Sequence, residues 1–265
     1  MNINLKFLLI GTSLFLIPSI TYAQCSPAQS CAELGYKETT NKGGCLKCPF
    51  GNGWYCPAPE EEKTVLGECT GYAKNCTIGQ ILNSDGTCTT DKVSGKTPIG
   101  VVVYIGSDNC GQALALKDLG NMEWGGYGTD IPDLPNYSSS SAAEQDFDSC
   151  GNTQKIIKQG NANKYPAAWA TVDYAPSSVL ATKGKWCLPA AGVAHSMMNN
   201  YDKINSGLSK AGGESLPTLS DHNHWNWSSS EYSYDDAWVW CYACGRLANG
   251  YYKYNYGYVR PVLAF

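Results

Sequence analysis

The sequence has no long apolar run after its first 20 residues. Lys6 precedes an apolar stretch at 7–20, and Thr21-Tyr22-Ala23 follows it as a small-x-small cleavage site. This order predicts a secretory signal peptide at residues 1–23, with cleavage before Gln24. A membrane anchor is the alternative, but about 14 apolar residues are too few to span a bilayer as a helix. We therefore expect a mature chain without a transmembrane helix that is secreted, periplasmic or at the cell surface.

The chain also has little positive charge and few groups that perform chemistry. Its formal net charge is −4, which gives no electrostatic basis for binding nucleic acid. It contains neither a nucleotide-binding glycine loop nor a nucleophile elbow. The one histidine cluster, His222-Asn223-His224 beside Asp221, is more typical of a turn than of a metal site. The sequence therefore predicts that the protein binds no cofactor or metal ion and is not an enzyme.

All 13 cysteines follow the expected cleavage point. In an exported chain they predict disulfides, and their odd number requires that at least one is free or bonded to another chain. Residues 24–95 hold eight of them among few aliphatic residues, so we expect a small module held together by disulfides. A zinc or redox pair at Cys45 and Cys48 is less favoured, because this module has no histidine. The eight are Cys25, Cys31, Cys45, Cys48, Cys56, Cys69, Cys76 and Cys88.

Residues 96–265 have the pattern of a second, α+β domain. Residues 99–105 are β-branched and almost wholly apolar, which predicts a buried strand, and residues 112–117 predict another. Short strands and turns follow from residue 225 to the C-terminus. We expect the first and last strands, 99–105 and 259–265, to pair in a mixed or antiparallel sheet.

Two helices are expected between these strands. Helical spacing occurs at 142–159, and again from Pro189 to residues 208–210, where Gly212-Gly213 ends the pattern. Segments 167–170 and 186–189 are expected to face the core. The expected inward residues of the two helices are Phe147, Ile156, Ile157, Val193, Met197, Tyr201, Ile204 and Leu208.

The C-terminal segment is rich in tyrosine. Eight of the 18 tyrosines lie between Tyr232 and Tyr258, among small and polar residues. Tyrosine gives a large contact area at low entropic cost, and Asn, Ser and Gly give adaptable hydrogen bonds, so this composition is typical of a binding surface. The alternative is a set of strands whose aromatic residues only pack against one another.

Strand periodicity separates a frame from displayed positions. In 238–242 it places Trp238, Trp240 and Tyr242 on a buried face and leaves Cys241 outward. In an extended segment, Tyr252, Tyr254, Tyr256 and Tyr258 would line one face, which we expect to be exposed. The expected frame comprises Trp227, Ala237, Trp238, Trp240, Tyr242, Leu247, Lys253 and 259–265.

Several motifs resemble one bacterial family. Residues 99–104 (IGVVVY), 113–118 (ALALKD) and Trp124-Gly125 resemble the opening of the domains catalogued as DUF1566. Residues 184–190 (GKWCLPA), 227–233 (WSSSEYS), Ala237-Trp238 and 259–262 (VRPV) resemble their central and C-terminal motifs. The resemblance covers residues 98–265 and implies a C-type lectin-like fold, similar to that of formylglycine-generating enzymes. It also implies a variable protein of a diversity-generating retroelement, whose C-terminal segment is hypermutated to alter ligand binding.

This resemblance implies which residues bind. Randomised adenines, often in AAC codons, can give Asn, Tyr, Asp, Ser, Gly, Cys, Ala or Arg, but not Trp or Lys. Trp238, Trp240 and Lys253 would then belong to the scaffold. The partner would be a macromolecular ligand, a protein or glycan on another cell or surface. The expected ligand-binding residues are Tyr234, Asp235, Asp236, Cys241, Cys244, Arg246, Asn249, Tyr252, Tyr254, Asn255, Tyr256 and Tyr258.

Two other functions stay open at this point. One is a periplasmic enzyme with the formylglycine-generating fold, which needs a reactive cysteine. The other is a structural surface or pilus-associated protein. A calcium-dependent lectin is not expected, because Glu-Pro-Asn and Gln-Pro-Asp motifs are missing.

Three details of the second domain are also expected. Cys241 and Cys244 could form a local bridge, pair with Cys187 or be free, and Cys110 with Cys150 is a plausible pair. Arg260 is expected to make structural contacts, either a salt bridge or hydrogen bonds to backbone carbonyls.

Overall fold

The computed structural model describes residues 46–47, 54–55, 65–69 and 73–265. The chain divides into two compact units, Met1–Glu62 and Lys63–Phe265. In the first unit, the described strands β1 (Leu46–Lys47) and β2 (Trp54–Tyr55) pair antiparallel. Helices in the described part of the chain all lack the combination of length and apolarity that a membrane span requires. The expected signal peptide at 1–23 and five cysteines lie outside the described residues: Cys25, Cys31, Cys45, Cys48 and Cys56.

A six-stranded sheet with the order β4-β3-β5-β6-β13-β8 forms one half of the larger unit. The strands β5 (Pro98–Ile105) and β6 (Gly111–Ala115) confirm the two strands expected from the sequence. The C-terminal strand β13 (Val262–Ala264) pairs with β6 and with β8 (Trp186–Cys187). The expected pairing of 99–105 with 259–265 is therefore wrong. A short hairpin places β6 next to β5, so β6 occupies the edge that the C-terminal strand was expected to take.

Two strands before residue 95 belong to the same sheet. β3 (Ile81–Asn83) pairs with β5, and β4 (Cys88–Thr89) pairs with β3. Ile81 and Leu82 are fully buried, so this short apolar strand contributes to the core of the larger unit. The two compact units divide between Glu62 and Lys63, whereas the composition of the sequence predicts a boundary near residue 95. A strand as short as β3 could not be predicted from composition, because the average aliphatic content of residues 24–95 is low.

Disulfides tie several of these elements together. Cys69–Cys110 and Cys76–Cys88 link the segment before residue 95 to the sheet, and Cys150–Cys187 and Cys241–Cys244 lie further along the chain. Within the described residues, no cysteine is free. The expected pair of Cys110 with Cys150 is wrong, because each has a nearer partner. Of the alternatives open for Cys241 and Cys244, the structure shows the local bridge.

A five-stranded sheet with the order β11-β10-β9-β12-β7 forms the other half. Two antiparallel hairpins join three strands, and β12 returns parallel to β9 and antiparallel to β7. Trp238, Trp240 and Tyr242 pack in one core cluster, whereas Val239 packs in another on the opposite face. The bounds are β7 (Asn121–Glu123), β9 (Asn226–Glu231), β10 (Asp236–Cys241), β11 (Arg246–Tyr252) and β12 (Tyr256–Tyr258).

Each of the two expected helices is divided in two. The segment 142–159 forms α1 (Ser140–Ala143) and α2 (Ser149–Ile157), because Asp148 caps a new helix by accepting a hydrogen bond from the Gly151 amide (2.9 Å). The segment after Pro189 forms α4 (Ala191–Asn199) and α5 (Tyr201–Ala211), and α5 ends at Gly212 as expected. The core-facing segment at 167–170 belongs to a further helix, α3 (Pro166–Asp173). Two 3-10 turns are η1 (Ala73–Asn75) and η2 (Ser177–Thr182).

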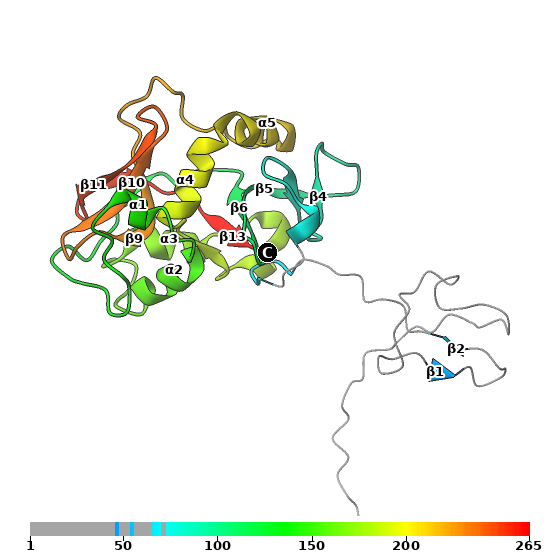
Figure 1. The fold of residues 1–265 in the computed structure, drawn as a ribbon, viewed down its shortest axis with the longest axis horizontal. Coiled ribbons are helices and arrows are strands. Elements are labelled where there is room, and N and C mark those ends of the chain that lie inside the picture. The colour runs from blue at the N-terminus through cyan, green and yellow to red at the C-terminus, as the bar shows by residue number, and fades with distance from the viewer. Residues whose placement is uncertain (1–45, 48–53, 56–64, 70–72) are drawn as a thin grey trace, which may run out of the picture. The chain divides into compact units, whose positions relative to one another are not determined.

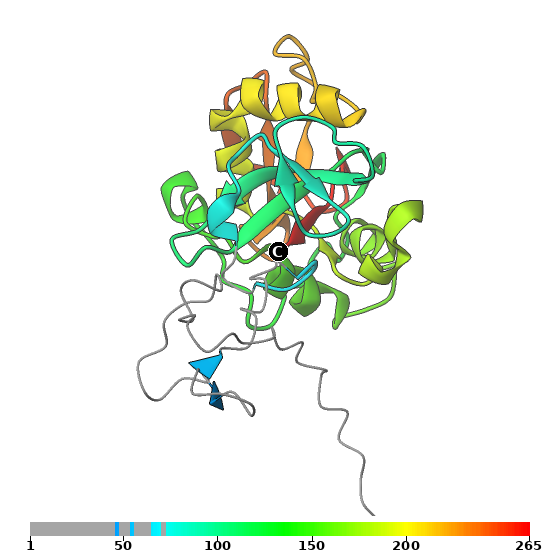
Figure 2. The same cartoon turned by 90° about the vertical axis from the view of Figure 1, so that its right-hand side faces the viewer.

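Helix α4 lies between the two sheets. It packs against β5 of the six-stranded sheet and against β9, β10 and β11 of the five-stranded sheet (Figure 1). Helix α5 crosses β3 and β5, as the yellow helix above the cyan and green strands shows in Figure 2. Helices α2 and α3 cover β8 and the β7 and β9 strands. The structure thus confirms an α+β domain with largely antiparallel sheets.

A close backbone approach under α5 gives a first testable prediction. A Cβ on Gly207 would lie 2.2 Å from the carbonyl oxygen of Gly79. Alanine normally favours a helix over glycine, but here it must displace backbone atoms. We expect Gly207→Ala to lower the free energy of unfolding by about 1–3 kcal/mol in urea titrations. The exposed Ser209→Ala on the same helix should change it by less than about 0.5 kcal/mol; a stabilised Gly207→Ala variant would contradict this packing.

Candidate functional site

A buried ion pair lies beneath the tyrosine-rich end of the five-stranded sheet. The side chains of Lys253 and Glu231 are both fully buried, and the Lys253 ammonium donates a hydrogen bond to the Glu231 carboxylate. The ammonium also lies 4.9 Å from the centre of the Trp124 ring. Glu231 accepts a second hydrogen bond from the Ile131 amide (3.2 Å). Both charges therefore have partners, as burial requires.

Lys253 joins three surface segments. Its ammonium donates to the carbonyl oxygens of Thr129 and Tyr234, each at 3.0 Å. Its backbone amide donates to the Asp235 carbonyl (2.9 Å), and its carbonyl accepts from the Gly125 amide (2.9 Å). The loop at 125–131, the turn between β9 and β10 and the turn after β11 are thus held by one residue, which we call the Lys253 anchor.

Burial opposes charge on both partners. It raises the pKa of the Glu231 carboxyl above its ordinary value, although the hydrogen bond from Lys253 opposes the rise. Burial likewise lowers the pKa of the Lys253 ammonium, and the carboxylate of Glu231 opposes that fall. Each group therefore depends on the other to stay charged inside the protein.

Three exposed tyrosines pack against one another above this anchor. The rings of Tyr252 and Tyr254 stack with centres 5.2 Å apart, and Tyr127 meets them edge-on at 6.0 and 4.8 Å. Their exposed fractions are 50% for Tyr127, 43% for Tyr252 and 47% for Tyr254. We call these three residues the tyrosine cluster. Tyr252 and Tyr254 were expected at the surface, and the structure places both there.

Tyr127 was missed by the sequence analysis. It lies in the loop between β7 and α1, more than 100 residues before the tyrosine-rich segment. Its one sequence signal is its position between Gly126 and Gly128, where an aromatic residue has no strand or helix to place it in a core. A hydrogen bond from the Gly125 amide to the Lys253 carbonyl brings this loop beside Tyr252 and Tyr254, and no pattern in the sequence predicts that contact.

The turn between β9 and β10 brings three further expected site residues to the same place. Tyr234 is 58% exposed, and Asp235 and Asp236 are half-buried. The hydroxyl of Ser233 accepts hydrogen bonds from the amides of Asp235 (3.2 Å) and Asp236 (3.1 Å), which closes the turn. Asp236 is the register partner of Tyr252 on the neighbouring strand. We call residues 233–236 the acidic turn.

Cys241, Cys244 and Arg246 lie at the opposite end of the β10–β11 hairpin. Cys241 is fully buried and bonded to Cys244, so its expected outward position is wrong. The strand β10 is covered on both faces, and alternation therefore gives no exposed side. Arg246 is exposed. The strand β11 includes Asn249, whose side chain lies outside the described residues.

The four tyrosines expected on one strand face do not share a strand. The chain turns at 253–255, where the Asn255 amide donates to the Tyr252 carbonyl (2.7 Å), so β11 ends before β12 begins. Tyr256 is 61% exposed on β12, and Tyr258 is half-buried. The expected single aromatic face is therefore replaced by the tyrosine cluster and two separate tyrosines.

Tyr258 lines a hollow of about 360 Å³ with His224, Asp118 and Arg260. The rings of His224 and Tyr258 stack with centres 3.6 Å apart. Burial raises the pKa of the Asp118 carboxyl to about 6, against the opposing charge of Arg260. Arg260 donates to the carbonyls of Ala115, Ser215 and Glu214, which confirms its expected structural role.

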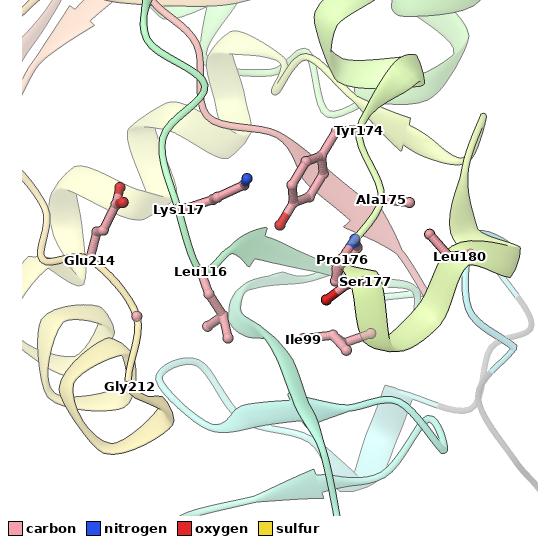
Figure 3. A pocket seen from close by; sticks show the side chains of 11 residues that line it. Ile99, Leu116, Lys117, Tyr174, Ala175, Pro176, Ser177, Leu180, Gly212 and Glu214 are labelled. Carbon is pink, nitrogen blue, oxygen red and sulfur yellow. The ribbon is translucent and has the colours of Figure 1, made fainter.

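A second hollow of about 600 Å³ lies beside the six-stranded sheet. Figure 3 shows Lys117 extending toward Tyr174, with Glu214 on the opposite side and Ile99 and Leu116 below. The Lys117 ammonium lies 5.6 Å from the centre of the Tyr174 ring. None of the twelve ligand-binding residues expected from the sequence lines this hollow.

The expected frame residues are buried, except that Ala264 is half-buried. Trp227, Ala237, Trp238, Trp240 and Lys253 are at most 2% exposed, and Tyr242 and Leu247 are at most 6% exposed. Among the described residues, one group brings three possible metal-ligating side chains together, namely Cys69, Asp108 and Cys110. Its two cysteines form a disulfide and offer no thiolate.

The buried pair gives a prediction with a pH signature. We expect Lys253→Met to lower the free energy of unfolding by about 3–5 kcal/mol near pH 8, because it leaves Glu231 buried without its partner. Without Lys253, the pKa of Glu231 rises further above its unfolded value, so the folded state then binds the proton more tightly. The loss should therefore shrink near pH 5 and grow as pH rises. Urea unfolding across this range measures it.

Two control variants test the cause. Lys210→Met removes a cation whose partner, Asp91, is exposed, and should change stability by less than about 1 kcal/mol at any of these pH values. The double variant Glu231→Gln/Lys253→Met should lose the pH dependence specific to Lys253→Met. A Lys253→Met variant as stable as the wild type near pH 8 would show that the pair does not hold this surface.

Comparison with known proteins identifies a fold relative. No family model matches the chain, and no curated protein matches it. The chain is similar to a fimbrial protein from Bacteroides ovatus ATCC 8483, with a TM-score of 0.52 and 16% sequence identity. The match covers 71% of this chain and 49% of the fimbrial protein, so the chain spans about half the length of that protein. At this identity the similarity shows a shared fold.

Proposed function

We propose that this chain is an exported binding or adhesion protein that presents the tyrosine cluster to a macromolecular ligand, a protein or a glycan on another cell or surface. The observation that carries the proposal is the packing of Tyr127, Tyr252 and Tyr254, exposed together above the Lys253 anchor. Aromatic side chains held rigidly at a surface lose little entropy on binding and supply large contact area. An aromatic residue that served only the core would be covered.

Export is supported by the disulfides of the larger unit, which persist in oxidising compartments. The fimbrial fold relative is compatible with a surface role. The signal peptide at 1–23 remains part of the proposal.

We further propose that the larger unit is a C-type lectin-like domain of the DUF1566 type, and that its exposed C-terminal positions vary as in diversity-generating retroelements. Two features support this. The first and last strands of the domain belong to one sheet, and the positions that adenine mutagenesis cannot reach, Trp238, Trp240 and Lys253, are buried. The most exposed expected positions, Tyr234 and Tyr256, are reachable ones.

A structural pilus-associated protein is the second candidate, because the fold relative is a fimbrial protein. A cysteine-dependent enzyme is less favoured, since the cysteines in the described part of the chain are all in disulfides.

A binding assay with cluster variants tests the main proposal. The triple variant Tyr127→Ala/Tyr252→Ala/Tyr254→Ala should bind bacterial cells, host glycoproteins or glycan arrays at least about tenfold more weakly than the wild type. Leu180→Ala/Leu219→Ala removes two other exposed apolar side chains and should bind normally. Unchanged binding by the triple variant would refute a role for the cluster. Loss of filament incorporation with unchanged binding would favour the pilus candidate.

Sequencing the encoding locus tests the diversification separately. We expect an adjacent near-repeat of the 3′ end that differs from it only at adenines, together with a reverse-transcriptase gene. A locus without these features would remove the diversification proposal and leave the binding proposal in place.

A further inference from the structure

The acidic turn carries two carboxylates without a basic partner. Among the described residues, the Asp235 side chain has neither a hydrogen-bond nor an ion-pair partner. Asp236 accepts one hydrogen bond from the Ser233 hydroxyl (3.2 Å) through Oδ2, and its Oδ1 is buried without a partner. Carboxylates at protein surfaces bind cations and N–H donors strongly. The Asp235 carboxylate therefore has unused capacity to accept hydrogen bonds from a positively charged group, and Asp236 adds a second negative charge beside it.

The same carboxylates act on the tyrosine cluster. Local desolvation, followed by the charge of Asp235, raises the pKa of the Tyr127 hydroxyl, and Tyr254, Tyr252 and Asp236 act in the same direction. Asp236 lies opposite Tyr252 in the β10–β11 ladder, so their side chains share a face. The nearest cation to this turn, Lys253, is fully buried and paired with Glu231. The two carboxylates therefore place negative charge beside the three rings.

Aromatic faces next to unpaired carboxylates match one ligand chemistry well. A guanidinium group is planar, stacks on tyrosine rings and donates two parallel hydrogen bonds to a carboxylate. A neutral sugar hydroxyl could also contact these carboxylates, but it would leave their charge uncompensated. Resting on the proposed binding function, we propose that the tyrosine cluster and the acidic turn together bind arginine side chains in a basic segment of a partner protein.

The probe is a pair of labelled peptides. One is a short Gly/Ser peptide carrying several arginines, and the other is identical except that citrulline, the neutral isostere, replaces each arginine. Full-length protein is titrated into each, and fluorescence anisotropy is measured. The arginine peptide should bind at least about tenfold more tightly than the citrulline peptide, and added salt should weaken it. Equal binding of the two peptides would overturn the proposal.

Protein variants locate the site. Asp235→Asn/Asp236→Asn should weaken arginine-peptide binding about tenfold or more, whereas Asp173→Asn/Asp202→Asn makes the same charge change at exposed positions elsewhere and should weaken it less than about twofold. Tyr127→Phe/Tyr252→Phe/Tyr254→Phe should retain binding because the ring faces remain, and the corresponding alanine variant should lose it. Equal losses in both aspartate pairs would show only a nonspecific charge effect and overturn the proposal.

A further result separates this inference from the proposed function. If the alanine variant fails to bind cells or glycans while the wild-type protein shows no preference for arginine over citrulline, the binding function stands and the arginine ligand is wrong. If the alanine variant binds every surface normally, the proposed function itself fails.

Discussion

The ammonium group of Lys253 is fully buried, and the groups that replace bulk water around it come from different parts of the surface. Glu231 supplies the countercharge, Thr129 and Tyr234 supply carbonyl oxygens, and Trp124 supplies a ring face. A buried charge is tolerated only when such partners are all in place. The loop at 125–131 and the turns on either side of β10 and β11 must therefore adopt their structures together. The surface residues carried by these segments are therefore held in defined positions as well.

This constraint explains why the exposed tyrosines occupy defined positions. A tyrosine on a freely moving loop would lose much of its binding energy to ordering on association. Here Tyr252 and Tyr254 flank the anchoring lysine directly, and Tyr127 is tied to it through the Gly125 amide. The rings also restrict one another through their mutual contacts. The exposed aromatic area is thus held in place by contacts within the domain itself.

Sequence patterns predicted the parts of this domain that depend on local properties. The apolar run at 99–105, the helix stop at Gly212 and the burial of Trp238 and Trp240 follow from periodicity and propensity, and the structure confirms them. Contacts between distant segments of the chain could not be predicted from such local patterns. The insertion of β6 between β5 and β13, the partners of Cys110 and Cys150, and the recruitment of Tyr127 all depend on which distant segments meet. Cys241 was assigned outward because alternation shows the two faces of a strand but not whether both are covered.

The contacts that Lys253 makes with its neighbours have a further consequence. Apart from Glu231 and the Trp124 ring, it recognises peptide groups: the carbonyls of Thr129, Tyr234 and Asp235 and the amide of Gly125. Peptide groups are present whatever side chain a residue carries. Substitutions of the side chains at 234 and 235 therefore remove none of the hydrogen bonds that Lys253 makes, provided that the backbone conformation is unchanged. The backbone atoms of these residues thus hold the fold, whereas their side chains face outward, so this surface can change its side chains while the fold beneath it stays the same.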